Sequence, residues 1–119
     1  MDERMDISYL RLSKEDGDVE DGSIDESCSI QSQRTCIKQY LHRNGFSVDR
    51  LSEIIDDGYS GTTMNRPGMN RLIKLVESGK VRTIIVRDFS RFARSYLEAG
   101  HYLEFIFPVY NVRFISIND

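Results

Sequence analysis

The stretch Tyr9-Leu10-Arg11-Leu12-Ser13 closes the first apolar run of the chain, which begins near residue 6. Side chains of a strand alternate between the two faces of a sheet, so Tyr9, Arg11 and Ser13 project to the same side. An arginine therefore lies beside a serine hydroxyl where a strand, predicted at about 6–12, runs into a loop. Ligands bind at that edge in open α/β sheets. A solvated arginine and a turn-forming serine are the alternative reading of this stretch alone.

Three further strands are predicted, and helical patterns separate them. Pro67 opens the second helix, and Gly45 and Gly79 end the first two. Ser95 and Glu98 form a capping box at the start of the third helix, which Pro108 is expected to end. The alternation predicts an α/β fold, with a mostly parallel sheet of four to five strands and helices on both faces. The further strands are predicted at about 51–55, 81–86 and 112–117, the first helix at about 29–44, and the apolar face of the third helix at Leu97, Leu103, Ile106 and Phe107.

A second group of polar residues follows the strand predicted at 81–86. It contains Arg91 and Arg94, which are three residues apart and would face the same way in a helical turn. Between the two groups lies a turn-rich segment, 56–61, and Arg66 stands just before the second helix. Because each segment follows a predicted strand, all of them would meet at one edge of a parallel sheet.

In this order, the residues resemble the serine recombinases, the resolvase and invertase family. The family pattern is Tyr-x-Arg-x-Ser, Asp-x-x-Ser-Gly, an arginine before the second helix, and Arg-x-x-Arg after a strand. Each motif is weak alone, but four in sequence over nearly the whole chain are a strong signal, closest to the large serine recombinases and transposon recombinases. The matching residues are Tyr9, Arg11, Ser13, Asp57, Ser60, Gly61, Arg66, Arg91 and Arg94, and Ser29 and Gln33 match a Ser-x-x-x-Gln near the first helix.

The resemblance implies a site-specific DNA recombinase whose serine cleaves DNA through a covalent phosphoserine. Ser13 would be the nucleophile. Arginine suits the remaining work, because its guanidinium is always charged and can grip a phosphate with two hydrogen bonds. The resemblance also implies a reaction that needs no metal and no other cofactor. The residues implied to bind the phosphate are Arg11, Arg66, Arg91 and Arg94, and the implied supporting residues are Gln33, Asp57, Ser60 and Tyr9, of which Asp57 could pair with an arginine and Tyr9 is expected to pack.

One position departs from the family pattern. Small resolvases and invertases carry aspartate immediately before the first arginine of Arg-x-x-Arg, where this chain has Ser90. The large serine recombinases tolerate serine there. Asp88 is nearby, but its position two residues earlier is wrong for a simple exchange. The role of an acid at this site, and the general acid and base, therefore stay open.

Composition is that of a soluble globular domain. The chain has 119 residues and a formal net charge of −3, so avid nonspecific binding to DNA is not expected from this piece alone. No apolar run approaches the roughly 20 residues that span a bilayer, and no signal peptide is visible, which predicts a cytoplasmic protein without a membrane partner. Cys28 and Cys36 are too far apart on one helix for a disulfide, and His42 and His101 lack metal-ligand spacing.

Residues 1–119 are expected to be one catalytic domain, a fragment that lacks the long dimerisation helix and the C-terminal DNA-binding domains of the family. The expected partners are DNA and further copies of the full-length protein, as a dimer and a synaptic tetramer. A non-catalytic, DNA-associated assembly module on the same fold is the alternative function. A phosphorylation receiver is disfavoured, because Arg11 and Ser13 occupy the position where it needs an acidic pair. A dinucleotide-binding domain is disfavoured too, because residues 14–17 do not form its glycine-rich turn.

Overall fold

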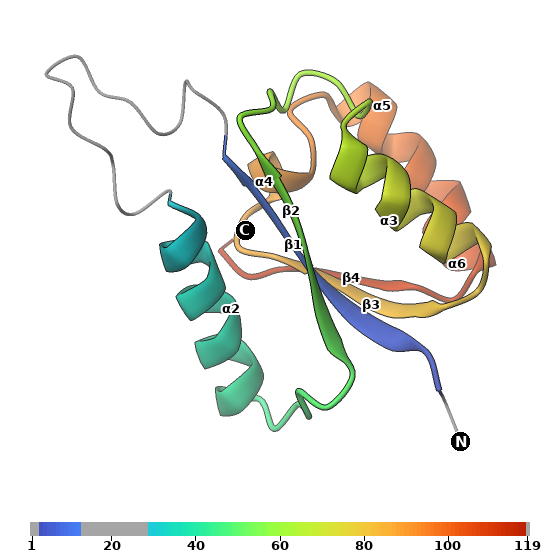
Figure 1. Ribbon diagram of the computed structural model, residues 1–119. Helices are drawn as coiled ribbons and strands as arrows, with labels where there is room; N and C mark the ends of the chain where they lie inside the picture. Colours follow the sequence, from blue (N-terminus) through green and yellow to red (C-terminus); the bar gives the residue numbers. More distant parts are fainter. Residues whose placement is uncertain (1–2, 13–28, 119) are drawn as a thin grey trace, which may run out of the picture.

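The structure is a computed structural model, and it describes residues 3–12 and 29–118 (Figure 1). Four strands in these ranges form one sheet in the order β2-β1-β3-β4, and every neighbouring pair is parallel. The predicted α/β class with a parallel sheet is therefore confirmed. The strands are β1 (Met5–Leu12), β2 (Leu51–Asp57), β3 (Val81–Val86) and β4 (Arg113–Ser116).

Helices cover both faces of this sheet, as Figure 1 shows. On one face, α2 (Ile30–Arg43) packs Ile37 and Leu41 against Leu10 of β1. On the other face, α3 (Pro67–Glu77) and the helical segment that follows α4 (Phe89–Phe92) enclose a larger apolar core. Because both faces are covered, the central strands β1 and β3 are buried along almost their whole length, which is typical of parallel sheets.

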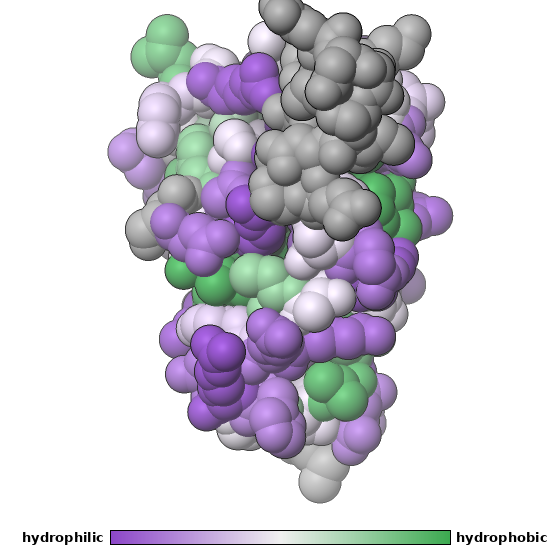
Figure 2. All heavy atoms as spheres, turned by 90° about the vertical axis from the view of Figure 1, so that its left-hand side faces the viewer, coloured by the Kyte–Doolittle hydropathy of each residue, from purple (hydrophilic) through white to green (hydrophobic). Residues whose placement is uncertain are grey.

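The outer face of α2 is polar. Figure 2 looks onto the side of the molecule that carries α2, and hydrophilic residues dominate this face outside the grey atoms. Ser29 caps the helix, since its side chain accepts a hydrogen bond from the backbone N–H of Ser32 at 3.0 Å. Gly45 follows the helix with φ of +71°, a conformation that suits glycine after a helix end. The amphipathic pattern of the sequence thus predicts this helix correctly.

The third predicted helix differs from expectation. It consists of α5 (Tyr96–His101), a π-helical turn η1 (Tyr102–Ile106) and α6 (Phe107–Val109), so Pro108 lies inside the helical segment. Leu97 was expected on the apolar face, but 94% of its surface is exposed. A π-helical turn holds more residues than an α-helical one, so it rotates the residues before it relative to those after it. A regular period of 3.6 residues therefore assigns Leu97 to the wrong face.

None of the helices in the described residues is both long and apolar enough to cross a membrane. Strand β2 extends two residues beyond its predicted end, to Asp57. This extension places Asp56 and Asp57 on a strand instead of in a turn, and their side chains point to opposite faces of the sheet.

Candidate active site

The predicted site lies at the carboxyl edge of the sheet, where the chain leaves β1, β2 and β3. Arg11 occupies the centre of this edge, and its side chain is fully buried. Its Nε donates to the carbonyl of Arg91 at 3.1 Å, and its two terminal nitrogens donate to the carbonyls of Tyr59 at 3.0 Å and Ser90 at 2.7 Å. One guanidinium on β1 thereby joins the segment after β2 to the segment after β3.

Arg66 approaches the same segment from the start of α3, and only 1% of its surface is exposed. Its guanidinium donates to the carbonyls of Arg91, at 3.3 Å, and Phe92. It also lies over the ring of Tyr9, 5.6 Å from the centroid, in a cation–π contact. Burial lowers the pKa of the Arg66 guanidinium, and the nearby Tyr9 and Asp56 side chains oppose this effect. Within the described residues, its Nε has no hydrogen-bond acceptor.

Arg91 is the third buried arginine of the edge, and it lies in α4 (Phe89–Phe92). One of its terminal nitrogens donates to the carbonyl of Arg11 at 3.0 Å, while Arg11 donates to the carbonyl of Arg91. The two residues are therefore linked in both directions. The carbonyl of Arg91 also accepts from Arg66, so three arginines meet around one peptide group.

Arg94 does not share a face with Arg91, so that expectation is wrong. Helix α4 ends at Phe92, and Ala93 is extended, with φ of −160° and ψ of 151°. Arg91 is consequently buried, whereas Arg94 is exposed. The backbone N–H of Arg94 donates to the carbonyl of Gly61 at 2.9 Å, which fixes it beside the turn after β2. Four residues of helix are too few to carry the period that the sequence suggested.

Gln33 of α2 supports Arg11 through its backbone. The Gln33 side chain is fully buried. Its amide accepts from the Arg11 N–H at 3.3 Å and donates to the Arg11 carbonyl at 3.0 Å. Strand β1 pairs with β3 only as far as Ser8, so these amide contacts replace strand pairing where the two strands separate. Gln33 thereby ties α2 to the end of β1.

The turn after β2 approaches Arg11 very closely. A Cβ atom added to Gly61 would lie 2.7 Å from a terminal nitrogen of Arg11 and 3.0 Å from Cγ of Arg94. Glycine is therefore needed here for space, whatever its backbone angles. Ser60 shapes the same turn, since its hydroxyl accepts from the backbone N–H of Thr62 at 3.2 Å and contacts the Thr62 hydroxyl at 2.9 Å.

The acid of this region is Asp56, which sequence reasoning missed. Asp57 is exposed and forms no ion pair with an arginine in the described part of the chain. The expected pairing of Asp57 with an arginine is therefore wrong. Asp56 is 2% exposed and accepts from the backbone N–H groups of Gly68 at 2.7 Å and Met69 at 3.0 Å. Because Arg66 makes no side-chain cap, Asp56 caps α3 from the neighbouring strand.

Tyr9 is a packing residue with one polar contact. It is completely buried, and its hydroxyl donates to Asp56 at 2.7 Å. Burial raises the pKa of the Tyr9 phenol far above its ordinary range, and the Asp56 carboxylate adds to the effect. The phenol therefore stays protonated and donates its hydrogen bond to the Asp56 carboxylate.

Ser13, the expected nucleophile, follows directly after Leu12 and lies outside the described residues. A hollow of about 490 Å³ opens beside α4, between the site edge and α5. The hollow is lined by Asp88, Phe89, Ser90, Ala93, Arg94 and Tyr96. Within the described residues, no group of three or more histidine, cysteine, aspartate and glutamate side chains could hold a metal ion.

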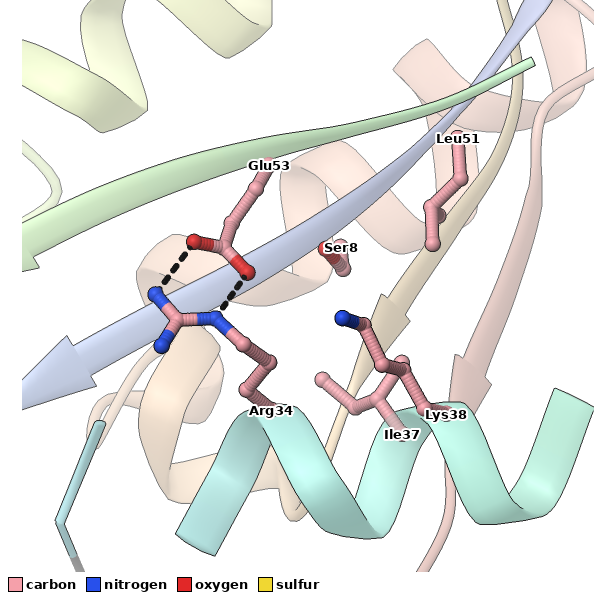
Figure 3. Close-up of a pocket in the computed structure, with 6 residues that line it drawn as sticks. All are labelled: Ser8, Arg34, Ile37, Lys38, Leu51 and Glu53. Carbon is pink, nitrogen blue, oxygen red and sulfur yellow. Dashed lines mark hydrogen bonds and ion pairs between the residues drawn. The ribbon is translucent and has the colours of Figure 1, made fainter. Parts of the chain in front are cut away.

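A second hollow, of about 330 Å³, lies between α2 and the strands β1 and β2 (Figure 3). In this view Arg34 of α2 reaches across to Glu53 of β2, and two contacts, at 2.6 and 2.8 Å, join the guanidinium to the carboxylate. Lys38 and Ile37 line the hollow from the same helix. None of the residues expected at the catalytic site lines it, so this hollow is separate from the arginine cluster.

Comparison with known proteins agrees with the geometry. The family model of the resolvase N-terminal domain matches residues 7–119. The N-terminal catalytic domain of TP901-1 integrase is similar to this chain, with a TM-score of 0.76 and 26% identity over 97% of this chain and 78% of that one. A resolvase family site-specific recombinase from Streptococcus pneumoniae has a TM-score of 0.71 and 27% identity, over 98% and 73%.

A more distant structure shares the fold. The C-terminal catalytic domain of ISC1926 TnpA, an IS607-like serine recombinase, has a TM-score of 0.69 and 23% identity, over 97% of this chain and 68% of that one. No curated protein sequence matches the chain. The class of protein that fold and site define is therefore a site-specific recombinase of the serine type. This chain belongs to the resolvase family, and residues 7–119 match the N-terminal domain of that family.

Proposed function

We propose that this domain cuts and rejoins DNA through a covalent bond between Ser13 and a backbone phosphate. The serine oxygen attacks phosphorus, and the bond from phosphorus to one deoxyribose oxygen breaks. The serine hydroxyl loses its proton in this step, and the leaving sugar oxygen takes up a proton and becomes a hydroxyl group. Rejoining is the reverse step, with a sugar hydroxyl as the attacking group. Since the phosphoserine conserves the energy of the broken bond, neither step needs ATP.

The observation that carries this proposal is the meeting of three buried arginines around the peptide group of Arg91. Arg11, Arg66 and Arg91 lie at the edge where β1 leads into Ser13. Phosphoryl transfer develops negative charge on phosphate oxygens, and preorganised cations in a site shielded from water stabilise that charge strongly. We propose that these three residues provide the positive floor of the site, and that the exposed Arg94 meets the DNA backbone beside the hollow near α4.

The supporting residues act through the arginines. We propose that Gln33 holds the backbone of Arg11, that Ser60 shapes the turn that covers its guanidinium, and that Tyr9 packs beneath Arg66. Loss of a charge-stabilising group lowers a reaction rate by about 10²–10³-fold. Lysine should rescue poorly at the arginine positions, because its ammonium group cannot form the guanidinium's paired hydrogen bonds.

We further propose that the domain works on DNA in the cytoplasm, as part of a homo-oligomer. Strand exchange between two DNA sites needs one nucleophile for each strand that is cut. A dimer on each site, and a synaptic tetramer of two dimers, would supply four copies of Ser13. The family match and the similarity to TP901-1 integrase support DNA as the substrate.

The test is the formation of a covalent protein–DNA adduct by the full-length protein. DNA carrying the junctions of the encoding element is incubated with the protein in EDTA, and the reaction is stopped with denaturant. We expect an adduct with the unaltered protein and with Ser52→Ala, which changes an exposed serine on β2. We expect none with Ser13→Ala, which removes the attacking oxygen.

Two results would contradict the proposal. An adduct that persists in Ser13→Ala would assign the nucleophile to another residue. No adduct from the unaltered protein, in spite of specific binding and pairing of the DNA sites, would favour the assembly module on the same fold. Binding and pairing are measured on the same samples by gel retardation, so a failure to bind DNA is distinguished from a failure to cut it.

A further inference from the structure

The carboxylate of Asp88 faces the arginine cluster from the start of α4. One of its oxygens accepts hydrogen bonds from the hydroxyl of Ser90 and from Nε of Arg91, the latter at 3.4 Å. The other oxygen lies 3.5 Å from Nε of Arg87. The side chains of Asp88 and Arg91 are only 17% and 5% exposed. This ion pair is therefore largely shielded from solvent, which strengthens it relative to a surface pair.

The usual reason for an aspartate at this position does not apply. Asp88 is the residue that precedes α4, where an aspartate side chain commonly accepts a backbone N–H of the first turn. Here the side chain makes no such cap. Its carboxylate is directed at the side chains of Ser90 and Arg91 instead. The aspartate therefore serves the arginine and not the helix.

This contact determines how Arg91 is presented to the site. The carboxylate holds Nε, and the carbonyl of Arg11 holds one terminal nitrogen. Two fixed nitrogens set the plane of a guanidinium, and that plane decides which way its remaining donors point. Ser90 adds a hydrogen bond to the same carboxylate oxygen, which steadies the oxygen that Arg91 contacts.

We propose that Asp88, steadied by Ser90, is the positioning residue that orients Arg91 toward the DNA phosphate. The inference rests on the proposed function, because it takes the phosphate to be the ligand of Arg91. It resolves the departure at Ser90, where small resolvases carry an acid. Asp88 is extended and precedes α4, and Arg91 is the third residue of that helix, so the first turn brings the guanidinium to the carboxylate.

The kinetic test measures the rate of adduct formation by the full-length protein for Asp88→Asn, Arg91→Lys and the double variant. Misplacing a reacting group by about 1 Å can lower a rate by roughly 100-fold, so we expect Asp88→Asn to react about 10- to 100-fold more slowly. If Asp88 acts through Arg91, its substitution should have little further effect in the Arg91→Lys background. Asp49 is exposed and lies at the other end of the sheet. Asp49→Asn is therefore the control, and it should react like the unaltered protein.

An exchange of the two side chains provides the rescue. Asp88→Ser/Ser90→Asp keeps one carboxylate and one hydroxyl in contact beside Arg91, and it should react faster than Asp88→Asn. A normal rate for Asp88→Asn would overturn the inference. Equal slowing by Asp88→Asn with arginine or lysine at position 91 would overturn it too, because the carboxylate would then act independently of Arg91.

A second measurement does not depend on activity. In this 119-residue chain, hydrogen exchange at the Arg91 Nε–H group is followed by NMR, with Arg91→Lys used to assign the signal. We expect slow exchange in the unaltered chain and faster exchange in Asp88→Asn, because the hydrogen-bond acceptor is lost. Equal exchange rates would overturn the orienting contact itself. If the unaltered protein formed no adduct, this result would still decide whether Asp88 holds Arg91.

Discussion

Replacing Asp56 by asparagine should destabilise the domain, whereas the same change at Asp57 should not. The Asp56 carboxylate is 2% exposed and accepts three hydrogen bonds, from Gly68, Met69 and Tyr9, at 2.7, 3.0 and 2.7 Å. Two of these donors are backbone N–H groups in the first turn of α3, which has no side-chain cap of its own. The exposed Asp57 side chain has none of these contacts.

The magnitude follows from the donors that asparagine cannot satisfy. Its single oxygen can serve the donors of only one carboxylate oxygen, and its amide group then faces an N–H or O–H donor. A hydrogen bond to a charged group contributes about 1.5–3 kcal/mol, and a carboxylate at a partly buried helix start contributes up to about 2 kcal/mol. Removing a buried charge offsets part of the loss. We expect Asp56→Asn to lower the free energy of unfolding by about 2–4 kcal/mol.

The assay is urea unfolding of the 119-residue chain at pH 7, followed by circular dichroism. Asp57→Asn is the matched control, since it changes the same group one residue away, and it should stay within about 0.5 kcal/mol of the unaltered chain. Equal stabilities for the two variants would refute the reasoning. So would a larger loss in Asp57→Asn, because the exposed residue would then carry the cap.

Two further predictions concern the turn after β2 and the hollow beside α2. Gly61→Ala should slow adduct formation by about 5- to 150-fold, because overpacking against the anchored Arg11 costs about 1–3 kcal/mol. Gly100→Ala is the control and should not slow the reaction, because its Cβ would meet nothing within 4 Å. Equal rates for the two variants would contradict the close approach of Gly61 to Arg11. The hydrogen bond from Arg34 lowers the pKa of Glu53 in the folded state. The pair therefore stabilises the fold at pH values above the pKa of Glu53 in the unfolded chain, and this stabilisation is lost as the pH falls through the pKa of Glu53 in the folded chain. In urea unfolding, Glu53→Gln should therefore be slightly less stable than the unaltered chain at pH 7, and this difference should shrink as the pH is lowered. A difference that grows toward acid would contradict this sign.

The main features of the site follow from short motifs at strand ends. Arg11, Arg66 and Arg91 were expected at one edge of a parallel sheet, and the structure brings them into contact. The prediction succeeds because the carboxyl ends of parallel strands necessarily share an edge. Gln33 could be placed only by resemblance, because an amide that replaces strand pairing leaves no pattern in the sequence.

The errors arise where a local period meets tertiary contacts. Asp57 matched a motif, but the extra length of β2 turns its side chain outward and turns Asp56 inward. Arg94 matched a helical spacing, but α4 ends before reaching it. One clue to Asp56 was present. No side chain directly before Pro67 caps α3, so the first N–H groups of this helix needed an acceptor from water or from another part of the fold.

The sequence by itself determined the alternation of strands and helices, the parallel sheet and the edge at which the polar residues gather. These properties follow from hydrophobic period, caps and turn residues, all of which act between near neighbours along the chain. Only the tertiary structure decided which acid is buried, which carbonyls the arginines bind and how Asp88 reaches Arg91. Those contacts depend on where the strands end, and they join residues up to 80 positions apart, such as Arg11 and Arg91. No local sequence pattern therefore predicts them.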